Sequence, residues 1–125
     1  MVVILKPASI TMGDPAGIGP EIIVKALSRL ESNDRYIVFG CPRVIQRAIQ
    51  TSSVEMVVNK ITNIEEATFK PNVIEVLETS SYKKLPAFGK TSEENGKSAF
   101  KAITSSIEHA LNGKVSSIVT APINK

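Results

Sequence analysis

A glycine- and proline-rich loop near the start of the chain places the tightest constraint on its fold. The loop spans Thr11 to Glu21 and joins a short apolar segment to an amphipathic one. Its glycines stand at positions 13, 17 and 19, and its prolines at positions 15 and 20. Glycine permits positive φ angles and close approach to the main chain, whereas proline restricts flexing. The pattern predicts a strand, a tight turn and a helix in succession.

The segment from Pro20 to about Leu30 has the pattern of an amphipathic helix. Its apolar residues recur with helical period, and Pro20 occupies a first helical position, where a missing N–H is tolerated. Glu21 lies in the first turn, where a carboxylate complements the helix dipole. Unpaired N–H groups at a helix start can face a phosphate or a carboxylate. The loop is therefore a candidate anion or nucleotide site, although a turn that serves backbone geometry alone fits the same pattern.

Two common phosphate-binding motifs are excluded by the details of this loop. No Gly-Lys-Ser/Thr follows the glycines, so the loop is not a P-loop. The glycine spacing also differs from the G-x-G-x-x-G fingerprint of dinucleotide-binding domains. Asp14 fits two roles, because it can organise the turn by bonding nearby amides or point into a ligand cleft.

Apolar strand patterns alternate with amphipathic helix patterns along the rest of the chain. This order predicts an α/β fold with a mostly parallel sheet flanked by helices, in which ligands lie beyond the carboxyl ends of strands. We expect strands at 9–12, 36–40, 54–58, 73–77 and 117–120, and helices at 20–30, 42–50 and 92–111. The apolar stripe of the last helix should consist of Ala99, Phe100, Ile103, Ile107, Ala110 and Leu111.

Composition argues against several classes of partner. The net charge of +3 is mild, and lysine and arginine are scattered among acidic residues without a basic stripe, so we expect no nucleic-acid binding. No apolar run approaches the ~18 residues of a membrane span, so we expect no membrane insertion and a cytoplasmic protein. One histidine, His109, and one cysteine, Cys41, cannot form a zinc site, which needs three or four converging ligands. His109 lies off the apolar stripe and should be a solvated surface residue.

Two separated motifs together resemble one enzyme family. ITMGDPAGIGPEI, from Ile10 to Ile22, resembles the N-terminal signature of the 4-hydroxythreonine-4-phosphate dehydrogenases, enzymes of pyridoxal 5'-phosphate biosynthesis. VTAPINK, from Val119 to Lys125, resembles the TAPINK-type segment of the same family. The first motif is also similar to the opening of the isocitrate and isopropylmalate dehydrogenases, whose fold this family shares. The ordered pair of motifs is therefore more specific than the loop alone.

The resemblance implies that the chain is the N-terminal portion of a longer two-domain dehydrogenase, with residues 1–125 containing no second domain. The intact family enzyme oxidises the secondary alcohol of 4-phosphooxy-L-threonine with NAD or NADP, uses a divalent metal such as zinc, and releases carbon dioxide from the product. It is expected to be a homodimer. The family's three metal-binding histidines and its substrate-binding His-Thr pair follow the TAPINK segment, so we expect no catalytic residue, no metal and no bound cofactor in this chain.

The resemblance also implies site residues for the family's small phosphorylated hydroxy-acid substrate and its dinucleotide. The dinucleotide side of the cleft is assigned to Gly13, Asp14, Ala16, Gly17, Ile18 and Gly19, and the substrate side to Asn124 and Lys125. Close relatives act on threonate or erythronate phosphates, and the segment does not discriminate among these substrates. A catalytically inactive, truncated module that oligomerises or binds a nucleotide is the remaining alternative.

Overall fold

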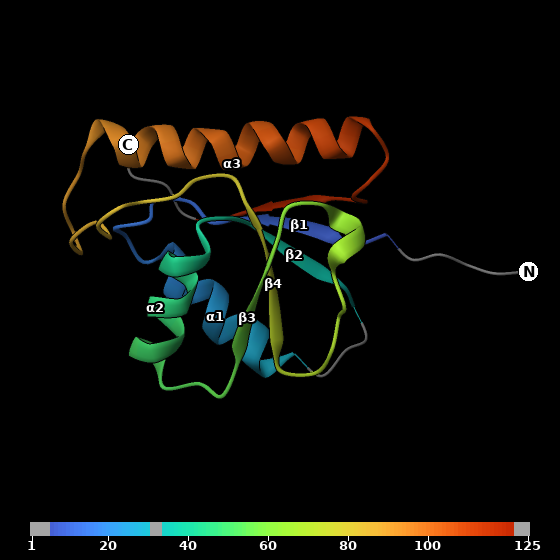
Figure 1. The fold of residues 1–125 in the computed structure, drawn as a ribbon, viewed down its shortest axis with the longest axis horizontal. Helices are drawn as coiled ribbons and strands as arrows, with labels where there is room; N and C mark the ends of the chain where they lie inside the picture. The colour runs from blue at the N-terminus through green and yellow to red at the C-terminus, as the bar shows by residue number, and fades with distance from the viewer. Residues whose placement is uncertain (1–5, 31–33, 122–125) are drawn as a thin grey trace, which may run out of the picture.

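Five parallel strands form a central sheet with helices on both faces (Figure 1). The computed structural model describes residues 6–30 and 34–121. The strands are β1 (Ala8–Thr11), β2 (Tyr36–Gly40), β3 (Val57–Ile61), β4 (Val73–Glu78) and β5 (Ile118–Thr120). The helices are α1 (Gly19–Arg29), α2 (Pro42–Ser52), α3 (Glu93–Leu111) and the short 3-10 helix η1 (Ile64–Glu66). The predicted fold class is confirmed.

The order of strands across the sheet is β3-β4-β2-β1-β5. The first strand is therefore interior, and Ser9 pairs with Ile37 of β2 on one side and Ile118 of β5 on the other. Every pairing between described strands is parallel, so all described strands end at the same edge of the sheet. That carboxyl edge is where ligands bind in open α/β sheets.

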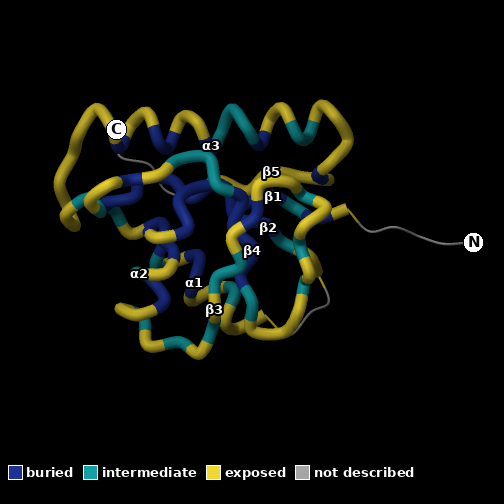
Figure 2. The backbone as a smooth tube through the Cα atoms, in the orientation of Figure 1, coloured by how far each residue is buried: buried dark blue, intermediate teal, exposed yellow. Residues whose placement is uncertain are grey.

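The two faces of the sheet bury two separate apolar clusters. Helices α1 and α2 pack on one face, against side chains that include Ile10, Val38 and Val76. Helix α3 covers the other face, where Phe39 and Ala102 are fully buried. Figure 2 shows the buried backbone concentrated in the central strands between these layers. Strands covered on both faces are mostly apolar, which explains why the sequence predicted the short runs of β2 and β4, although β4 also contains the buried Glu75.

The face that α3 turns to the sheet differs from the predicted apolar stripe. The buried positions are small residues, including Ser98, Ala102 and Ser106. Large apolar side chains point outward instead, with Phe100 69% and Leu111 83% exposed. Small side chains allow a helix to lie close to a sheet, so volume decided the orientation rather than hydrophobicity. The predicted stripe was correct at Ala99, which is buried, and at Ala110, which packs against the core, and wrong at Phe100, Ile107 and Leu111, which are exposed.

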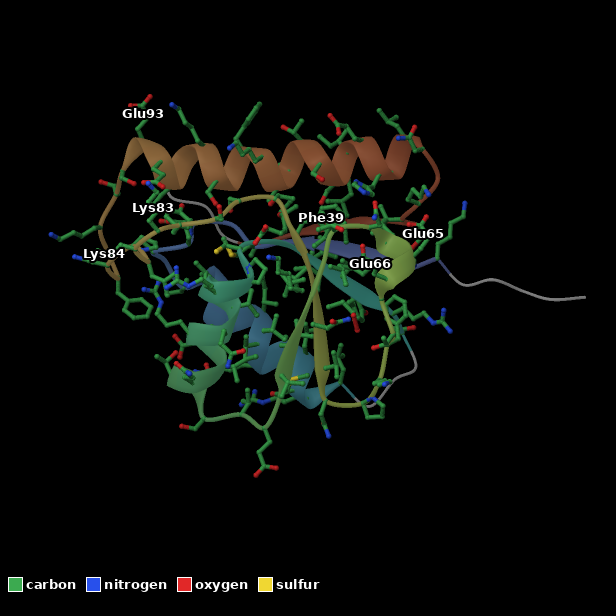
Figure 3. The ribbon with its side chains drawn as sticks, in the orientation of Figure 1. Phe39, Glu65, Glu66, Lys83, Lys84 and Glu93 are labelled. Atoms are coloured by element: carbon green, nitrogen blue, oxygen red, sulfur yellow. The ribbon has the colours of Figure 1, made fainter. Side chains whose placement is uncertain are left out.

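His109 is also placed differently from the prediction. Its ring lies edge-on to the ring of Phe39, with 5.0 Å between ring centroids. Its Nδ1 lies 2.7 Å from the carbonyl oxygen of Ser105, one turn earlier in α3. Figure 3 labels Phe39 between the sheet and α3. His109 is therefore a partly buried packing residue and not a solvated surface histidine.

Strand β3 lies three residues beyond the predicted strand at 54–58. Val54 and Met56 are partly buried against the core but precede the paired segment, which begins at Val57. The strand itself contains polar Asn59 and Lys60, and the carboxylate of Glu75 on β4 accepts a hydrogen bond from Asn59 Nδ2 at 2.6 Å. Because Asn59 and Glu75 form a polar pair between neighbouring strands, the hydrophobicity pattern did not indicate the correct bounds of β3. Within the described ranges, no helix has both the length and the apolar character to cross a membrane.

Candidate functional site

The two sequence motifs meet at neighbouring strand ends. Thr11, the last residue of β1, is paired with Thr120, the last residue of β5. The Ala121 N–H then donates to the Thr11 carbonyl oxygen at 3.1 Å. The chain departs from β1 toward β2, while β5 lies on the opposite side, so this is a position where ligands bind in open α/β sheets. Asn124 and Lys125, the proposed substrate residues, lie outside the described residues.

The loop that follows β1 is organised by Asp14. Its Oδ1 accepts a hydrogen bond from the Ala16 N–H at 2.9 Å, and its carbonyl oxygen accepts one from the Gly17 N–H at 3.1 Å. Of the loop's glycines, Gly13 has a positive φ, 79°, which a residue with a side chain adopts at a cost. Of the two roles open to Asp14, the geometry therefore supports the one that organises the turn.

Part of the loop's backbone is buried or already hydrogen-bonded. Gly13, Ala16 and Gly19 are buried, and the amides of Ala16 and Gly17 already bond to Asp14. In contrast to these buried residues, Ile18 is 63% exposed. The cavity against the loop measures only about 10 Å³, which is about the size of one water molecule. The loop thus presents the apolar side chain of Ile18 at its surface.

An irregular segment from Tyr82 to Lys90, which we call the strap, runs from the exit of β4 toward α3 and lies against the loop. The Gly89 N–H donates to the Ala16 carbonyl oxygen at 2.8 Å. Most strap residues are exposed, and Figure 3 labels Lys83 and Lys84 on it. No pattern in the sequence of this segment indicates its contact with the loop.

Two arginines of α2 hold the strap. Arg43 Nη1 donates to the Tyr82 carbonyl oxygen at 2.7 Å, and Arg47 Nη1 donates to the Pro86 carbonyl oxygen at 2.6 Å. Their spacing of four residues places them on one face of the helix. That spacing was the available signal in the sequence, but it carries no information about which carbonyl groups the arginines reach.

A second, larger cavity of about 330 Å³ lies between the exit of β4 and the first turns of α3. Hydroxyl groups dominate its interior, and Ser80 Oγ lies 2.7 Å from Ser98 Oγ. The formal charges of its lining residues cancel, because two are acidic, Glu78 and Glu94, and two are basic, Lys97 and Lys101. Such a cavity is at the lower limit of small-molecule sites and has no charge that selects for an anion.

Tyr82 anchors the strap beneath this cavity. Its hydroxyl donates to Asn95 Oδ1 at 3.1 Å, and Asn95 Nδ2 donates to the Lys90 carbonyl oxygen at 3.1 Å. Asn95 thus links both ends of the strap to α3. Burial raises the pKa of the Tyr82 phenol above its usual value of 10.0, and the nearby Glu94 carboxylate acts in the same direction.

We expect the stability of the protein to fall above pH 10 because of Tyr82. The pKa of Tyr82 is higher in the folded state than in the unfolded state, where it is near 10.0. The contribution of the neutral Tyr82 phenol to stability is therefore complete below the unfolded-state pKa and is lost as pH rises through the folded-state pKa. Tyr82→Phe should flatten this alkaline loss while costing roughly 1 kcal/mol at neutral pH through the unpaired Asn95 oxygen. Urea unfolding at several pH values measures both effects, and an unchanged alkaline slope in Tyr82→Phe would contradict the assignment.

The described part of the chain lacks the ligand cluster that a metal centre requires. Among residues 6–30 and 34–121, no group of three or more His, Cys, Asp or Glu side chains could hold a metal ion. Cys41 is buried at the start of α2, and His109 lies between α3 and the sheet. The described residues therefore do not fit a metal centre.

Comparison with known proteins finds relatives that are named as dehydrogenases. Residues 32–125 match the family model described as pyridoxal phosphate biosynthetic protein PdxA. The chain is 42% identical over 125 residues to a 4-hydroxythreonine-4-phosphate dehydrogenase of Beijerinckia indica, covering 100% of this chain and 37% of that protein. It is 41% identical to the D-threonate 4-phosphate dehydrogenase of Salmonella typhimurium, covering 96% of this chain and 38% of that protein.

Solved structures agree with these matches. A 4-hydroxythreonine-4-phosphate dehydrogenase from Burkholderia phymatum superposes with a TM-score of 0.92 at 33% identity, covering 98% of this chain and 38% of that one. The enzyme of the same name from Klebsiella pneumoniae gives a TM-score of 0.87 at 35% identity, covering 96% of this chain and 38% of that one. The chain thus spans under two-fifths of the length of the relatives that it matches.

Proposed function

Because the chain belongs to the PdxA family of pyridoxal phosphate biosynthetic proteins, we propose that it forms the N-terminal portion of a longer NAD- or NADP-dependent dehydrogenase. The observation that carries this proposal is the match of the whole chain, at 42% identity, to a protein named as a 4-hydroxythreonine-4-phosphate dehydrogenase. The chain covers 37% of that relative, so the activity is proposed for the complete gene product.

The proposed reaction is the oxidation of 4-phosphooxy-L-threonine at its secondary alcohol. The carbinol hydrogen leaves as hydride to NAD(P)⁺, the hydroxyl proton goes to a base, and the resulting 3-oxo acid loses carbon dioxide. A divalent metal such as zinc belongs to this proposal for the complete gene product. We assign no step through a metal to the described residues, because they contain no cluster that fits one.

A second candidate substrate is D-threonate 4-phosphate. The 41% identity to the Salmonella typhimurium enzyme that bears this substrate in its name is nearly as high as the identity to the first relative. Both substrates carry a phosphate and a secondary alcohol, so the described residues do not separate them. The second candidate keeps the dehydrogenase chemistry and changes only the acid that is bound.

A direct assay tests this proposal. The complete gene product is purified and assayed for NADH or NADPH formation with each phosphorylated hydroxy acid, in the presence of added divalent metal. We expect turnover with one of the two acids and loss of turnover on chelation. Lack of turnover with either acid and either dinucleotide would overturn the proposed function and favour the inactive-module alternative.

The loop's proposed role is an apolar contact with the dinucleotide through Ile18. The support is the 63% exposure of Ile18 at the carboxyl edge of the sheet, where the Ala16 and Gly17 amides are already bonded to Asp14. An apolar side chain packs against a ring or a ribose, whereas a pyrophosphate would need free N–H groups. We therefore assign the loop to a nucleoside part of the dinucleotide and not to its phosphates.

Replacing Ile18 by serine should weaken dinucleotide binding without unfolding the protein. Burying an isoleucine side chain contributes about 1.5–3 kcal/mol, so we expect KM for the dinucleotide to rise roughly tenfold while kcat changes little. Val57→Ser is the matched control, because Val57 is 59% exposed and lies in β3 at the far side of the sheet. Equal KM values in Ile18→Ser and the control would refute the contact.

We also propose that the complete gene product is a cytoplasmic homodimer without a nucleic-acid or membrane partner. The support on this chain is the outward apolar surface of α3, where Phe100 and Leu111 are exposed and need covering. Light scattering on the complete gene product measures the assembly state. A monomeric mass would overturn the dimer without affecting the enzymatic proposal.

A further inference from the structure

Arg47 lies between the loop and the strap and contacts both. Its Nη2 donates to the Pro15 carbonyl oxygen at 3.2 Å, and its Nη1 donates to the Pro86 carbonyl oxygen at 2.6 Å. Its guanidinium also stacks over the Phe88 ring, 4.1 Å from the centroid. One half-buried side chain of α2 therefore joins two segments that are about seventy residues apart in the sequence.

The contact between loop and strap is reinforced beside Arg47. The Gly89 N–H donates to the Ala16 carbonyl oxygen at 2.8 Å, so consecutive loop carbonyls, at Pro15 and Ala16, both accept from this side. The strap's two ends are fixed independently of the loop, by Arg43 at Tyr82 and by Asn95 at Lys90. The strap contacts the loop directly at Gly89, and Arg47 joins Pro86 to Pro15.

The geometry depends on features that arginine has and lysine lacks. A guanidinium is planar and presents several N–H groups in a fixed fork, so it can donate to two carbonyl groups and stack on a ring at once. A lysine ammonium keeps the positive charge but has neither the fork nor the flat face. Arg47→Lys therefore removes the clamp and leaves the charge in place.

We infer that Arg47 is a positioning residue: by clamping Pro15 to the strap, it holds the loop in the conformation that presents Ile18 to the dinucleotide. This inference rests on the proposed function of the loop. Without the clamp the loop populates other conformations, and only a fraction of the molecules can bind the dinucleotide. The apparent dissociation constant for the dinucleotide then equals the intrinsic constant divided by that fraction. The chemistry itself is unaffected, because Arg47 does not touch the reacting atoms in this assignment.

The test compares Arg47→Lys with Arg43→Lys in the complete gene product. Arg43 also donates to the strap, yet it contacts the strap's end and not the loop, so it controls for loss of an arginine on α2. Amide hydrogen exchange at Ala16, Gly17 and Gly89 reports on the clamp, because each of these N–H groups is hydrogen-bonded at the loop or its contact with the strap. Steady-state kinetics and fluorescence titration with NADH or NADPH report on binding.

We expect Arg47→Lys to speed exchange at all three amides, raise KM and the dissociation constant for the dinucleotide about tenfold, and leave kcat within twofold. Arg43→Lys should leave the loop amides and the dinucleotide constants at wild-type values. Phe88→Ala, which removes an exposed ring, should shift the same readouts in the same direction by a smaller factor. It also serves as the test if Arg47→Lys fails to fold.

Two results would overturn the inference. In the first, the loop amides of Arg47→Lys exchange at wild-type rates. In the second, they exchange faster while the dinucleotide constants stay unchanged. A wild-type protein that turns over neither acid would instead reject the proposed reaction, and the exchange and titration data would then decide the role of Arg47 without it.

Discussion

Gly40→Ala is expected to destabilise the protein by about 2–3 kcal/mol and to lower Tm by roughly 10 °C. A Cβ added at Gly40 would lie 2.6 Å from Met12 Cβ and 2.8 Å from Met12 Sδ. The Sδ contact could relax by a rotamer change, but a Cβ moves only with its backbone. Met12 is fully buried at the exit of β1, so the clash has to be relieved by shifting the strand that carries the candidate loop.

Gly96→Ala is the matched control for Gly40→Ala. A Cβ at Gly96, inside α3, meets nothing within 4 Å, so this change should stabilise the protein by up to about 1 kcal/mol through helix propensity. Thermal unfolding followed by circular dichroism measures both variants. If Gly40→Ala unfolded at the wild-type temperature, the close approach of β1 and β2 at this point would be wrong.

Glu75→Gln is expected to cost about 1.5–3 kcal/mol, although it preserves the size of the side chain. Glu75 is 2% exposed and accepts three hydrogen bonds, from Asn59 Nδ2, Thr68 Oγ1 and the Phe69 N–H. A carboxylate can accept all three, whereas a glutamine amide turns its own N–H₂ toward one of these donors. Phe69 adopts a positive φ of 51°, so the carboxylate also holds a strained turn in place.

Glu78→Gln supplies the comparison on the same strand. Glu78 pairs with Lys60 at 3.7 Å near the surface, where such pairs contribute about 0–1 kcal/mol. Urea unfolding of both variants should therefore give a clearly larger loss for Glu75→Gln. Similar losses at the two positions would mean that the buried network around Glu75 contributes no more than a surface ion pair.

The sequence predicted those parts of the fold where burial follows hydrophobicity. Strand β2 and the start of α2 at Pro42 matched the predictions, because a double-sided apolar strand and a proline at a helix start are unambiguous patterns. The predicted range of β3 began three residues too early. The strand contains polar Asn59, whose partner is the buried Glu75 carboxylate on β4, and a hydrophobicity pattern does not detect such a pair. The predicted stripe of α3 was correct at the small residues Ala99 and Ala110 and wrong at the large ones, because the buried face of this helix also consists of small side chains such as Ser106.

From the sequence, the candidate site could be predicted only to the extent that the order of strands and loops along the chain determines it. Parallel strands end at the same edge of a sheet, and the pairing of Thr11 with Thr120 places the ends of the two motif-bearing strands side by side. The contact of Arg47 with both the loop and the strap depends on how a helix, a loop and an irregular segment pack in three dimensions. No spacing along the chain encodes it.

The interior position of β1 has a consequence for the order in which the protein can fold during its synthesis. Ser9 in β1 bonds through its hydroxyl to the carbonyl oxygen of Ser117, 108 residues later, at the entry to β5. At a translation rate of roughly 5–20 residues per second, about 5–20 s separate the emergence of the two strands from the ribosome. One edge of β1 therefore lacks its β5 partner throughout that interval, and an unpaired strand edge is a site where another chain can pair.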